Sequence, residues 1–282
     1  MLQKLDTKVV DKVQQRINQL KLLPIAREEL SRIFRSWKFK FVVLIMMLPV
    51  IILLLGAGEI QPADFGVDAT VYAFELNAGA NILEFWAALP AQFLVVMIAA
   101  ELIAGEVENS TLTLLLTKPI RRADILFGKL LAFLICLVCI TVIPLTAFAG
   151  LITLIYRGGR DGFFEILWGP FALGESVMIL GLLTIGCFAI MLSSVTRKSL
   201  YGALSALLFL FLFNLFVPYF SFLGPSYTLE YRLGLILEEG YRLVAETKFY
   251  TGDPILTLAI LVWLNILFLV IALIALFRRE MP

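Results

Sequence analysis

Residues Glu101–Lys129 read ELIAGEVENSTLTLLLTKPIRRADILFGK and join two strongly apolar segments of the chain. Acidic residues gather near the start of this stretch and basic residues near its end, whereas the flanking segments carry almost none. Long apolar segments cross a bilayer as helices, because in hydrocarbon the backbone polar groups must be satisfied within the segment. We therefore expect Glu101–Lys129 to be a charged hinge that connects two membrane spans on the cytoplasmic side.

The middle of this hinge is predicted to form a short helix. Asn109 or Ser110 can accept a hydrogen bond from the first free N–H groups of a helix over Thr111–Thr117. Pro119 ends that helix, because proline has no N–H and cannot continue the hydrogen-bond ladder. The apolar side chains that this helix exposes to the cytosol are Leu112, Leu115 and Leu116. Because they need a partner that buries them, the hinge is predicted to be a docking surface.

Basic side chains follow the predicted helix at Arg121, Arg122 and Lys129. We expect them at the lipid headgroups, where long side chains can keep their charges in water. Without a docking partner, the same stretch would be an ordinary surface turn with snorkelling arginines. The residue pattern by itself leaves both interpretations open.

The composition of the whole chain indicates that lipid is its natural solvent. Of its 282 residues, 61% are hydrophobic and 16% are charged, against about 45–50% and about 25% in soluble domains. The net charge of +1 provides no face for nucleic acid. The chain has no histidine, which excludes histidine-dependent nucleophilic pairs and HExxH zinc sites. Cys136, Cys139 and Cys187 lie in apolar runs and are predicted to be small core residues.

Six apolar segments are each near or above the roughly 20 residues that cross a bilayer. They lie at residues 40–57, 83–104, 128–156, 169–194, 199–218 and 254–277, and the first is short and contains Pro49. The predicted fold is therefore an all-α membrane protein with six transmembrane helices. In the fourth segment, Gly174, Gly181 and Gly186 are predicted to be positions where helices pack closely.

The loops between these segments set the predicted orientation. With six spans, alternate sides of the membrane carry 18 and 5 Lys and Arg residues. The richer side is expected to face the cytoplasm, which places both termini inside. Five or seven spans would put Arg278 and Arg279 outside, so six is favoured. The chain then divides into cytoplasmic N-terminal helices at residues 1–40 and a six-helix transmembrane domain at residues 41–282.

Two amphipathic segments precede the first span. Residues 1–23 have apolar positions at helical spacing, and Pro24 ends this pattern. Residues 25–40 place Trp37 and other apolar residues largely on one side, and the charged residues, Glu29 among them, mostly on the other. A basic face opposite aromatic residues is typical of a helix that lies in the headgroup plane.

The few polar residues inside the predicted spans each have two interpretations. Glu175, near the outer start of the fourth span, is a candidate for a translocation pathway, because an ionisable group in the membrane is costly and usually functional. Its alternative is a carboxylate at the level of the headgroups. Gln92 and Asn214 are further pathway candidates. Like Asn265, they more often form hydrogen bonds between helices.

The hinge resembles the signature of type-2 ABC exporter permeases, which are membrane subunits that pair with a separate ATP-binding-cassette ATPase. The residues that carry the resemblance are Glu101, Gly105, Glu106, Ser110, Thr111, Leu112, Leu115, Leu116, Pro119, Ile120, Arg121, Arg122, Gly128 and Lys129. Residues 26–30 and Trp37 resemble the N-terminal helix of the same family, with Glu28 where lysine is common. Six spans with both termini inside match as well, so the resemblance covers nearly the whole chain.

The resemblance implies roles for two groups of residues. A coupling helix at Asn109–Thr117 would sit in a groove of the ATPase, and an interface helix at residues 25–38 would contact the same ATPase and the membrane surface. The implied coupling residues are Glu106, Glu108, Asn109, Ser110, Thr111, Leu112, Leu115, Leu116, Pro119, Arg121 and Arg122. The implied interface residues are Arg27, Glu28, Arg32, Arg35 and Trp37. Ion pairs of Glu101, Glu106 and Glu108 would fix the hinge.

The resemblance also implies that the energy comes from another chain. The sequence has no GxxxxGK[ST] phosphate loop, so we expect no cofactor in this chain, no enzyme activity of its own, and ATP and Mg²⁺ in the partner ATPase. The other implied partners are a second permease, identical or a sister, accessory membrane or extracytoplasmic subunits, and the lipid bilayer. The implied location is the bacterial inner membrane, and the implied direction is export.

Three other functions are compatible with a polytopic membrane chain. A non-transporting scaffold that uses an ABC ATPase for mechanical work differs from an exporter only in moving no solute. A secondary transporter usually shows inverted repeats and buried carboxylates for ion coupling, and neither is evident here. An intramembrane protease needs histidine chemistry or paired aspartates, which the spans lack. The cargo is not specified, although aromatic, nearly uncharged spans suit a lipidic or amphipathic solute.

Overall fold

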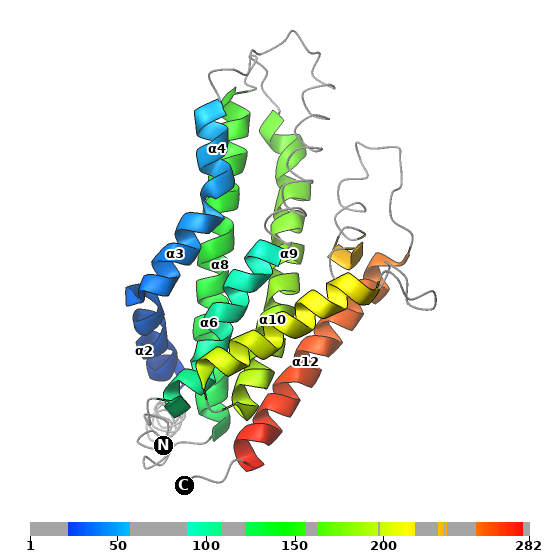
Figure 1. Cartoon of the computed structure of the whole chain (residues 1–282). Coiled ribbons are helices and arrows are strands. Elements are labelled where there is room, and N and C mark those ends of the chain that lie inside the picture. Colours follow the sequence, from blue (N-terminus) through cyan, green and yellow to red (C-terminus); the bar gives the residue numbers. More distant parts are fainter. Residues whose placement is uncertain are drawn as a thin grey trace, which may run out of the picture.

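The computed structural model describes residues 22–56, 89–108, 122–155, 163–196, 198–217, 231–233, 235 and 252–278. Every regular element in these ranges is helical, which confirms the predicted all-α class. The helices are α2 (Leu22–Arg35), α3 (Trp37–Met46), α4 (Leu48–Gly56), α6 (Leu89–Glu108), α8 (Arg122–Ile155), α9 (Phe163–Val195), α10 (Ser199–Phe216) and α12 (Pro254–Arg278). They form an elongated bundle in which α8 and α9 run along its length and α10 crosses obliquely (Figure 1).

Four described helices are long and apolar enough to cross a membrane. These stretches are Asp124–Phe148 in α8, Glu175–Val195 in α9, Ser199–Phe216 in α10 and Pro254–Arg278 in α12. The other two predicted spans fall on α3 with α4, and on α6. The first pair are helices of 10 and 9 residues, each too short to span alone. The 20 residues of α6 include three glutamates near its end.

The first predicted span is divided in two by its proline. α3 ends at Met46, and α4 begins at Leu48 with Pro49 in its first turn. Because proline has no N–H, the backbone ladder cannot run unbroken through this point. Flanking bonds persist on both sides, from the Met47 N–H to the Val43 carbonyl and from the Ile51 N–H to the Met47 carbonyl, each at 3.0 Å. Both short helices pack along α8 (Figure 1).

Glycines allow α9 to pack closely against its neighbours. A Cβ on Gly186 would lie 2.3 Å from the ring of Phe133 in α8, and a Cβ on Gly181 would lie 2.7 Å from Leu233. Both distances are far below van der Waals contact, so only glycine fits without a shift of the neighbour. This confirms the predicted close packing at Gly181 and Gly186. The surroundings of Gly174 are outside the description.

A polar contact joins α9 to α12 in the middle of the bundle. The side-chain amide of Asn265 donates to Thr184 Oγ1 at 2.7 Å and to the Leu261 carbonyl at 2.8 Å. The prediction that Asn265 forms a hydrogen bond between helices is therefore confirmed. Such bonds connect helices where apolar packing alone gives little preference for one neighbour over another.

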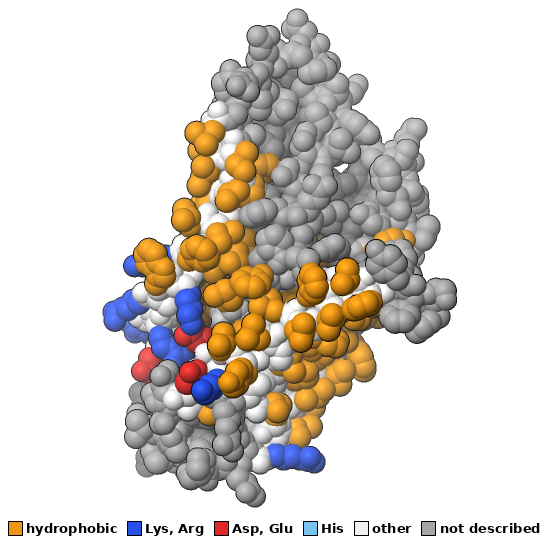
Figure 2. Space-filling view, viewed as in Figure 1, with side chains coloured by type: hydrophobic (Ala, Val, Ile, Leu, Met, Phe, Trp, Pro, Cys, Tyr) orange, Lys and Arg blue, Asp and Glu red, His pale blue; other side chains and the backbone are white. Residues whose placement is uncertain are grey.

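The outer surface that the described residues of the bundle present in Figure 2 is mostly apolar. Orange side chains cover the outward sides of α10, α12, α3 and α4, while charged side chains gather near α2 (Figure 2). The exposed residues include Leu208, Phe213, Trp263, Ile266 and Ile52. A soluble protein rarely exposes a continuous apolar surface of this size, so this surface suits the hydrocarbon of a bilayer.

Candidate functional site

The interface helix predicted over residues 25–38 is two helices with a joint at Ser36. α2 begins at Leu22 with Pro24 in its first turn, where a missing N–H does no harm. Ser36 accepts a hydrogen bond from the Phe39 N–H at 3.2 Å and donates to the Ile33 carbonyl at 2.7 Å. The serine thus caps the start of α3 and ends α2. The predicted interface helix over residues 25–38 is therefore interrupted at Ser36.

One face of α2 is buried against the bundle, and it includes an acid. Ala26, Glu29 and Ile33 are 4%, 5% and 8% exposed, whereas Trp37, just beyond α2, is 78% exposed. Glu29 was predicted on the polar side, and this was wrong. Its position three residues after Ala26 and four before Ile33 puts it on the apolar stripe. That spacing was the signal in the sequence that could have identified Glu29.

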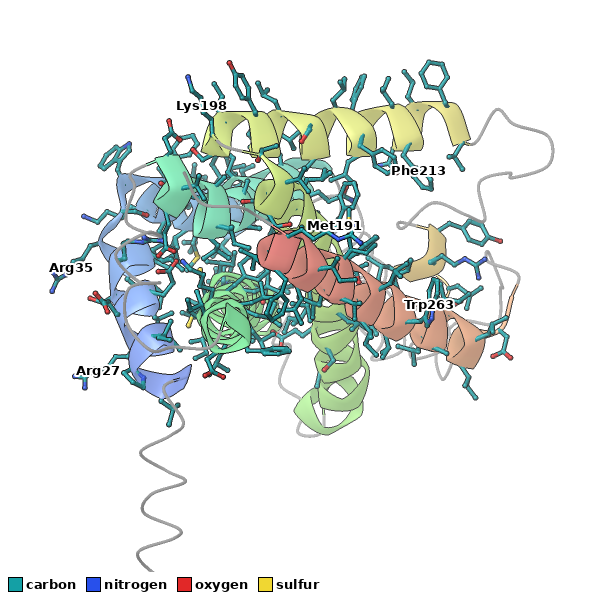
Figure 3. All side chains as sticks on the ribbon, turned by 90° about the horizontal axis from the view of Figure 1, so that it is seen from below. Arg27, Arg35, Met191, Lys198, Phe213 and Trp263 are labelled. Atoms are coloured by element: carbon teal, nitrogen blue, oxygen red, sulfur yellow. The ribbon has the colours of Figure 1, made fainter. Side chains whose placement is uncertain are left out.

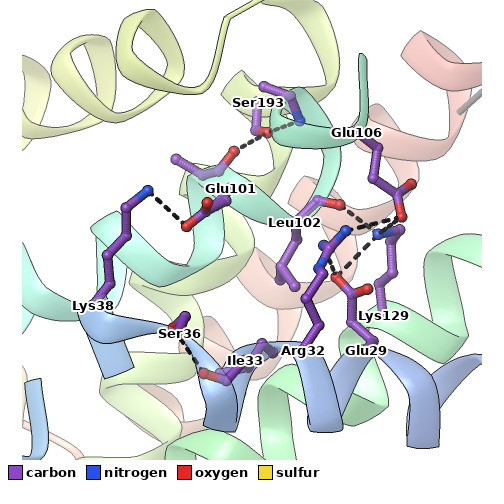
Figure 4. Close-up of polar contacts among 12 residues, drawn as sticks. Glu29, Arg32, Ile33, Ser36, Lys38, Glu101, Leu102, Glu106, Lys129 and Ser193 are labelled. Carbon is purple, nitrogen blue, oxygen red and sulfur yellow. Dashed lines mark hydrogen bonds and ion pairs between the residues drawn. The ribbon is translucent and has the colours of Figure 1, made fainter. Parts of the chain in front are cut away.

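Four charged side chains meet where α2 contacts α6 and α8, and we call Glu29, Arg32, Glu106 and Lys129 the charge cluster (Figure 4). The Lys129 Nζ lies 2.8 Å from Glu106 Oε1 and 3.1 Å from Glu29 Oε1. Arg32 pairs with Glu29 one turn away and lies 3.5 Å from Glu106 Oε1. Two acids and two bases give the charge cluster no net charge.

Lys129 is the centre of the charge cluster and is almost completely buried. Its side chain is 2% exposed, and its Nζ also donates to the Leu102 carbonyl at 2.6 Å. An ammonium group has three donors, and here each of them has an acceptor. Burying a charge is strongly unfavourable unless it is paired and hydrogen-bonded, and the ammonium group of Lys129 meets both conditions.

The predicted place of Lys129 at the lipid headgroups was therefore wrong. The prediction assumed that the third span starts near residue 128, whereas α8 begins at Arg122. Lys129 consequently lies about two turns inside the helix, level with the end of α6. Its partner Glu29 is 100 residues away in the sequence, so no local pattern indicates the pair.

Hydroxyl and carboxylate contacts hold the other side of α6, and we call Ser193, Ser199 and Glu108 the serine junction. Ser193 of α9 accepts from the Ala104 N–H at 2.9 Å and donates to the Ala100 carbonyl at 2.6 Å (Figure 4). Glu108 Oε2 accepts from the backbone N–H of Ser199 at 3.1 Å and from its hydroxyl at 3.0 Å.

Glu108 caps the start of α10, and these bonds affect its protonation. The backbone and side-chain hydrogen bonds from Ser199 hold the pKa of the Glu108 carboxyl below its ordinary value of 4.5, and the nearby Lys198 and Lys38 charges add to this. An acceptor at a helix N-terminus also interacts favourably with the helix dipole. Glu108 therefore stabilises the start of α10 in its ionised form.

The three glutamates at the end of α6 have different partners. Glu101 pairs with Lys38 of α3 at 2.9 Å, and both side chains are nearly half exposed. Glu106 pairs with Lys129 in the charge cluster. Glu108 bonds to Ser199 instead of to a basic side chain. The Lys38–Glu101 pair lies on a small cleft of about 100 Å³ that Arg32 and Ser36 also line.

The predicted coupling residues flank or fall within the hinge. α6 ends at Glu108, and α8 begins at Arg122. The other predicted coupling residues lie outside the described residues, and they are Asn109, Ser110, Thr111, Leu112, Leu115, Leu116, Pro119 and Arg121. The charge cluster thus connects the two helices that flank the hinge, and the serine junction holds the end of α6 where the hinge begins.

The predicted interface residues lie mostly on the outer face of α2. Arg27 and Arg35 point away from the bundle (Figure 3). They line an open polar surface with Pro24, Glu28, Ser31 and Arg32. Arg32 is 46% exposed, and its guanidinium pairs with Glu29 and Glu106 of the charge cluster. Its side chain therefore reaches from the outer surface of α2 into the interior.

The structure does not bring the three candidate pathway residues together. Gln92 is 1% exposed and lines an apolar groove of about 390 Å³ between α6 and α10, together with Phe93, Leu204 and Phe211. The described lining of this groove includes neither Asn214 nor Glu175. Both of these are half-buried, on α10 and α9 respectively.

No metal or cofactor site is evident in the part of the chain that the structure describes. Within those residues, no group of three His, Cys, Asp or Glu side chains could hold a metal ion. Cys136 and Cys187 are buried, and Cys139 is half-buried. The described contacts of the site join α6 and α8 to one another and to α2.

A comparison with known protein families identifies one that matches this chain. A family model described as ABC-2 family transporter protein matches residues 23–281. Among curated proteins, none matches the chain. Proteins of the matched family are multi-pass membrane components without an ATPase domain, and they act with ABC ATPases. The match covers almost the entire sequence, and the chain belongs to the ABC-2 family of transporter membrane proteins.

Proposed function

We propose that the chain is the permease subunit of an ABC exporter, and that it converts movement of a partner ATPase into movement of its spans through the hinge at residues 109–121. In this proposal residues 1–40 are cytoplasmic, and residues 41–282 form six spans with both termini inside. Two permeases, identical or paired with a sister, enclose the pathway in the bacterial inner membrane. ATP and Mg²⁺ bind to the partner.

The observation that carries the proposal is the charge cluster. α6 ends at Glu108, and α8 begins at Arg122. Glu106, two residues before the end of α6, lies 2.8 Å from Lys129, which is seven residues after the start of α8. Both sides of the hinge are thus tied to one another and to Glu29 in α2. A force applied to residues 109–121 would therefore move the ends of α6 and α8 and the helix α2 together.

The outer face of α2 supports a second contact with the same partner. Arg27 and Arg35 point away from the bundle (Figure 3), and Arg32 links this face to the charge cluster through Glu29 and Glu106. An ATPase that contacts both the hinge and α2 would act on one connected unit. Arg32 is the residue through which the two contacts communicate.

The charge cluster is suited to transmit force because it resists rearrangement. The pairs of Lys129 with Glu29 and Glu106 would be expensive to separate, since all three side chains are buried and a buried charge that loses its partner costs about 3–5 kcal/mol. An apolar contact of the same size could slide with a smaller penalty. The buried charges therefore favour one fixed geometry between α2, α6 and α8.

The transport pathway is proposed to include the surfaces of α6 and α10. The apolar groove that Gln92 lines is consistent with a lipidic or amphipathic solute, because its described lining is mostly leucine and phenylalanine. Asn214 and Glu175 lie elsewhere on α10 and α9, and as pathway residues they would contribute from other parts of the bundle. Accessory membrane or extracytoplasmic subunits would receive the solute on the outer side.

The proposal is tested by placing a charge on the predicted docking helix. We expect Leu115→Asp to remain inserted in the membrane but to reduce the amount of ATPase that copurifies by about tenfold or more, because a buried unpaired charge costs several kcal/mol. Nucleotide-hydrolysis rates of the purified complex should fall to that of the ATPase alone. Thr113→Asp is the matched control, since it adds the same charge at a neighbouring polar position.

Equal recovery of the ATPase with Leu115→Asp and with the wild type would refute docking through this hinge. A separate measurement distinguishes transport from scaffolding. Vesicles that contain the purified complex and a fluorescent phospholipid should move the probe between leaflets while ATP is hydrolysed. Stimulated hydrolysis without movement of any solute would instead indicate a non-transporting scaffold.

A further inference from the structure

The Ser193 hydroxyl occupies an unusual place in the backbone of α6. The Ala104 N–H and the Ala100 carbonyl are four residues apart, and in an uninterrupted α-helix these two groups bond to one another. Here Ser193 accepts from the first at 2.9 Å and donates to the second at 2.6 Å. The hydroxyl of α9 therefore bridges a donor and an acceptor that face one another in the hydrogen-bond ladder of α6, which is one unbroken helix from Leu89 to Glu108. Insertion of a side chain into this ladder is a recognised cause of helix bending.

Ser193 is held in this position by α10 as well as by α9. Its side chain is completely buried, and a Cβ on Gly202 of α10 would lie 3.3 Å from the Ser193 Cα. The missing side chain at Gly202 allows α10 to press against the serine. The hydroxyl is thus fixed by two helices, while the α6 groups that it bridges belong to a third.

The bridge divides α6 into two parts with different surroundings. Before it, Ala91, Val95 and Ala99 are completely buried in the apolar core. After it come Glu106 in the charge cluster and Glu108 in the serine junction. The part beyond the bridge therefore carries polar attachments and leads directly into the hinge at residues 109–121.

We propose that Ala100–Ala104 is a joint in α6 and that Ser193 is the positioning residue that keeps this joint easy to bend. A hydroxyl both donates and accepts, so it can keep the Ala104 N–H and the Ala100 carbonyl paired when they move apart. Without it, bending would leave two buried backbone groups unpaired. The end of α6 can then move with the charge cluster while the rest of α6 stays in the core.

This proposal rests on the proposed function only for the source of the movement, because the joint itself is a property of the isolated permease. Ser193→Ala should leave the Ala104 N–H and the Ala100 carbonyl with only one another as partners and make the end of α6 stiffer. We expect hydrogen–deuterium exchange of residues 101–108 to slow by about tenfold in the variant, measured on the purified permease in nanodiscs. A serine that merely fastens α6 to α9 predicts the opposite, since its removal would loosen α6 and speed exchange.

Thr141→Val is the matched control. Thr141 is a completely buried hydroxyl of α8 that donates to the Leu137 and Val138 carbonyls of its own helix. Its removal should leave exchange at residues 101–108 unchanged. Ser193→Cys retains a weaker donor and acceptor and should give an intermediate rate, which provides a second variant if Ser193→Ala does not fold.

Hydrogen–deuterium exchange of residues 101–108 that is unchanged or faster in Ser193→Ala would overturn the proposal that Ala100–Ala104 is a joint. In the complex with its copurifying ATPase, Ser193→Ala should keep ATPase binding but lower the stimulated hydrolysis rate by several-fold. Leu115→Asp should lose binding while leaving the exchange rate of the isolated permease unchanged. The two variants therefore separate a failure of the joint from a failure of the docking proposal.

Discussion

On the side of α6 that faces α2 and α8, three buried charges, on Glu29, Glu106 and Lys129, pair with one another, and the half-exposed Arg32 pairs with both acids. On the side that faces α9 and α10, the contacts of α6 are hydroxyls and an exposed carboxylate, and Gly202 of α10 packs closely behind Ser193. The first side fixes α6 by pairs that are costly to separate, and the second by bonds that can rearrange. The contrast suggests that one helix end can be rigidly attached to its driver and still turn against the core.

The most severe test of this contrast removes the central cation of the charge cluster. Lys129→Met should destabilise the protein by about 3–5 kcal/mol, because Glu29 and Glu106 are then buried without it. Thermal unfolding in detergent measures the change. Adding Glu106→Gln to this variant should recover part of the loss by removing one uncompensated charge. Lys40→Met is the control, since Lys40 is exposed on α3.

A single and a double variant of equal stability would show that the carboxylates are not energetically coupled to Lys129. A loss of less than about 1 kcal/mol in Lys129→Met, a value typical of exposed pairs, would show that the charge cluster is no stiffer than a surface contact. Either result would show that the contacts on the α2 and α8 side of α6 are no harder to separate than those on the α9 and α10 side.

The close packing on the serine side should give an intermediate effect. A Cβ on Gly202 would lie 2.9 Å from Thr196 Oγ1 and 3.3 Å from the Ser193 Cα. Gly202→Ala should therefore cost about 1–3 kcal/mol, as overpacking usually does. Gly150→Ala is the matched control, because a Cβ there meets nothing within 4 Å in α8. Equal thermal stability of the two alanine variants would argue against close packing at Gly202.

An exposed ion pair beside the charge cluster should matter less. Lys38 and Glu101 are 2.9 Å apart, but their side chains are 47% and 43% exposed. Lys38→Ala should cost about 0.2–1 kcal/mol, and the difference from the wild type should shrink in high salt. An effect as large as that of Lys129→Met, measured in the same unfolding assay, would mean that burial does not distinguish the two pairs.

The smallest expected effect depends on pH. Because the pKa of Glu108 is lowered in the folded protein, its contribution is present above the ordinary carboxyl pKa of 4.5 and is lost as the pH falls through the lower folded-state value. Wild type and Glu108→Gln should therefore differ slightly in melting temperature at pH 7 and converge below the ordinary pKa. A difference that grows on acidification would contradict capping of α10 by the ionised group.

Hydropathy predicted the parts of the fold that face lipid. The spans expected at residues 199–218 and 254–277 correspond to α10 at Ser199–Phe216 and α12 at Pro254–Arg278. Hydropathy predicted the start of a helix less accurately where the helix continues past its apolar portion. α8 begins at Arg122 rather than near residue 128, because a helix can extend into polar surroundings that hydropathy does not report.

The site was less predictable than the fold, and its residues show why. Glu106 was expected to form an ion pair because it sits in the hinge, but its partner Lys129 was placed at the headgroups. The pairs depend on how α2 packs across α6 and α8, which is tertiary information. Ser193 was not singled out at all, because a serine inside an apolar helix looks like any other and only the neighbouring backbone reveals its contact.

The break at Pro49 bears on how the chain is inserted during synthesis. α3 and α4 have 10 and 9 residues, so each is about 15 Å long or shorter and neither reaches across about 30 Å of hydrocarbon. Both pack on α8, which the ribosome makes much later. We therefore expect the first segment to depend on α8 for a stable position, and substitutions in α8 that weaken this contact should leave the N-terminal segment poorly inserted.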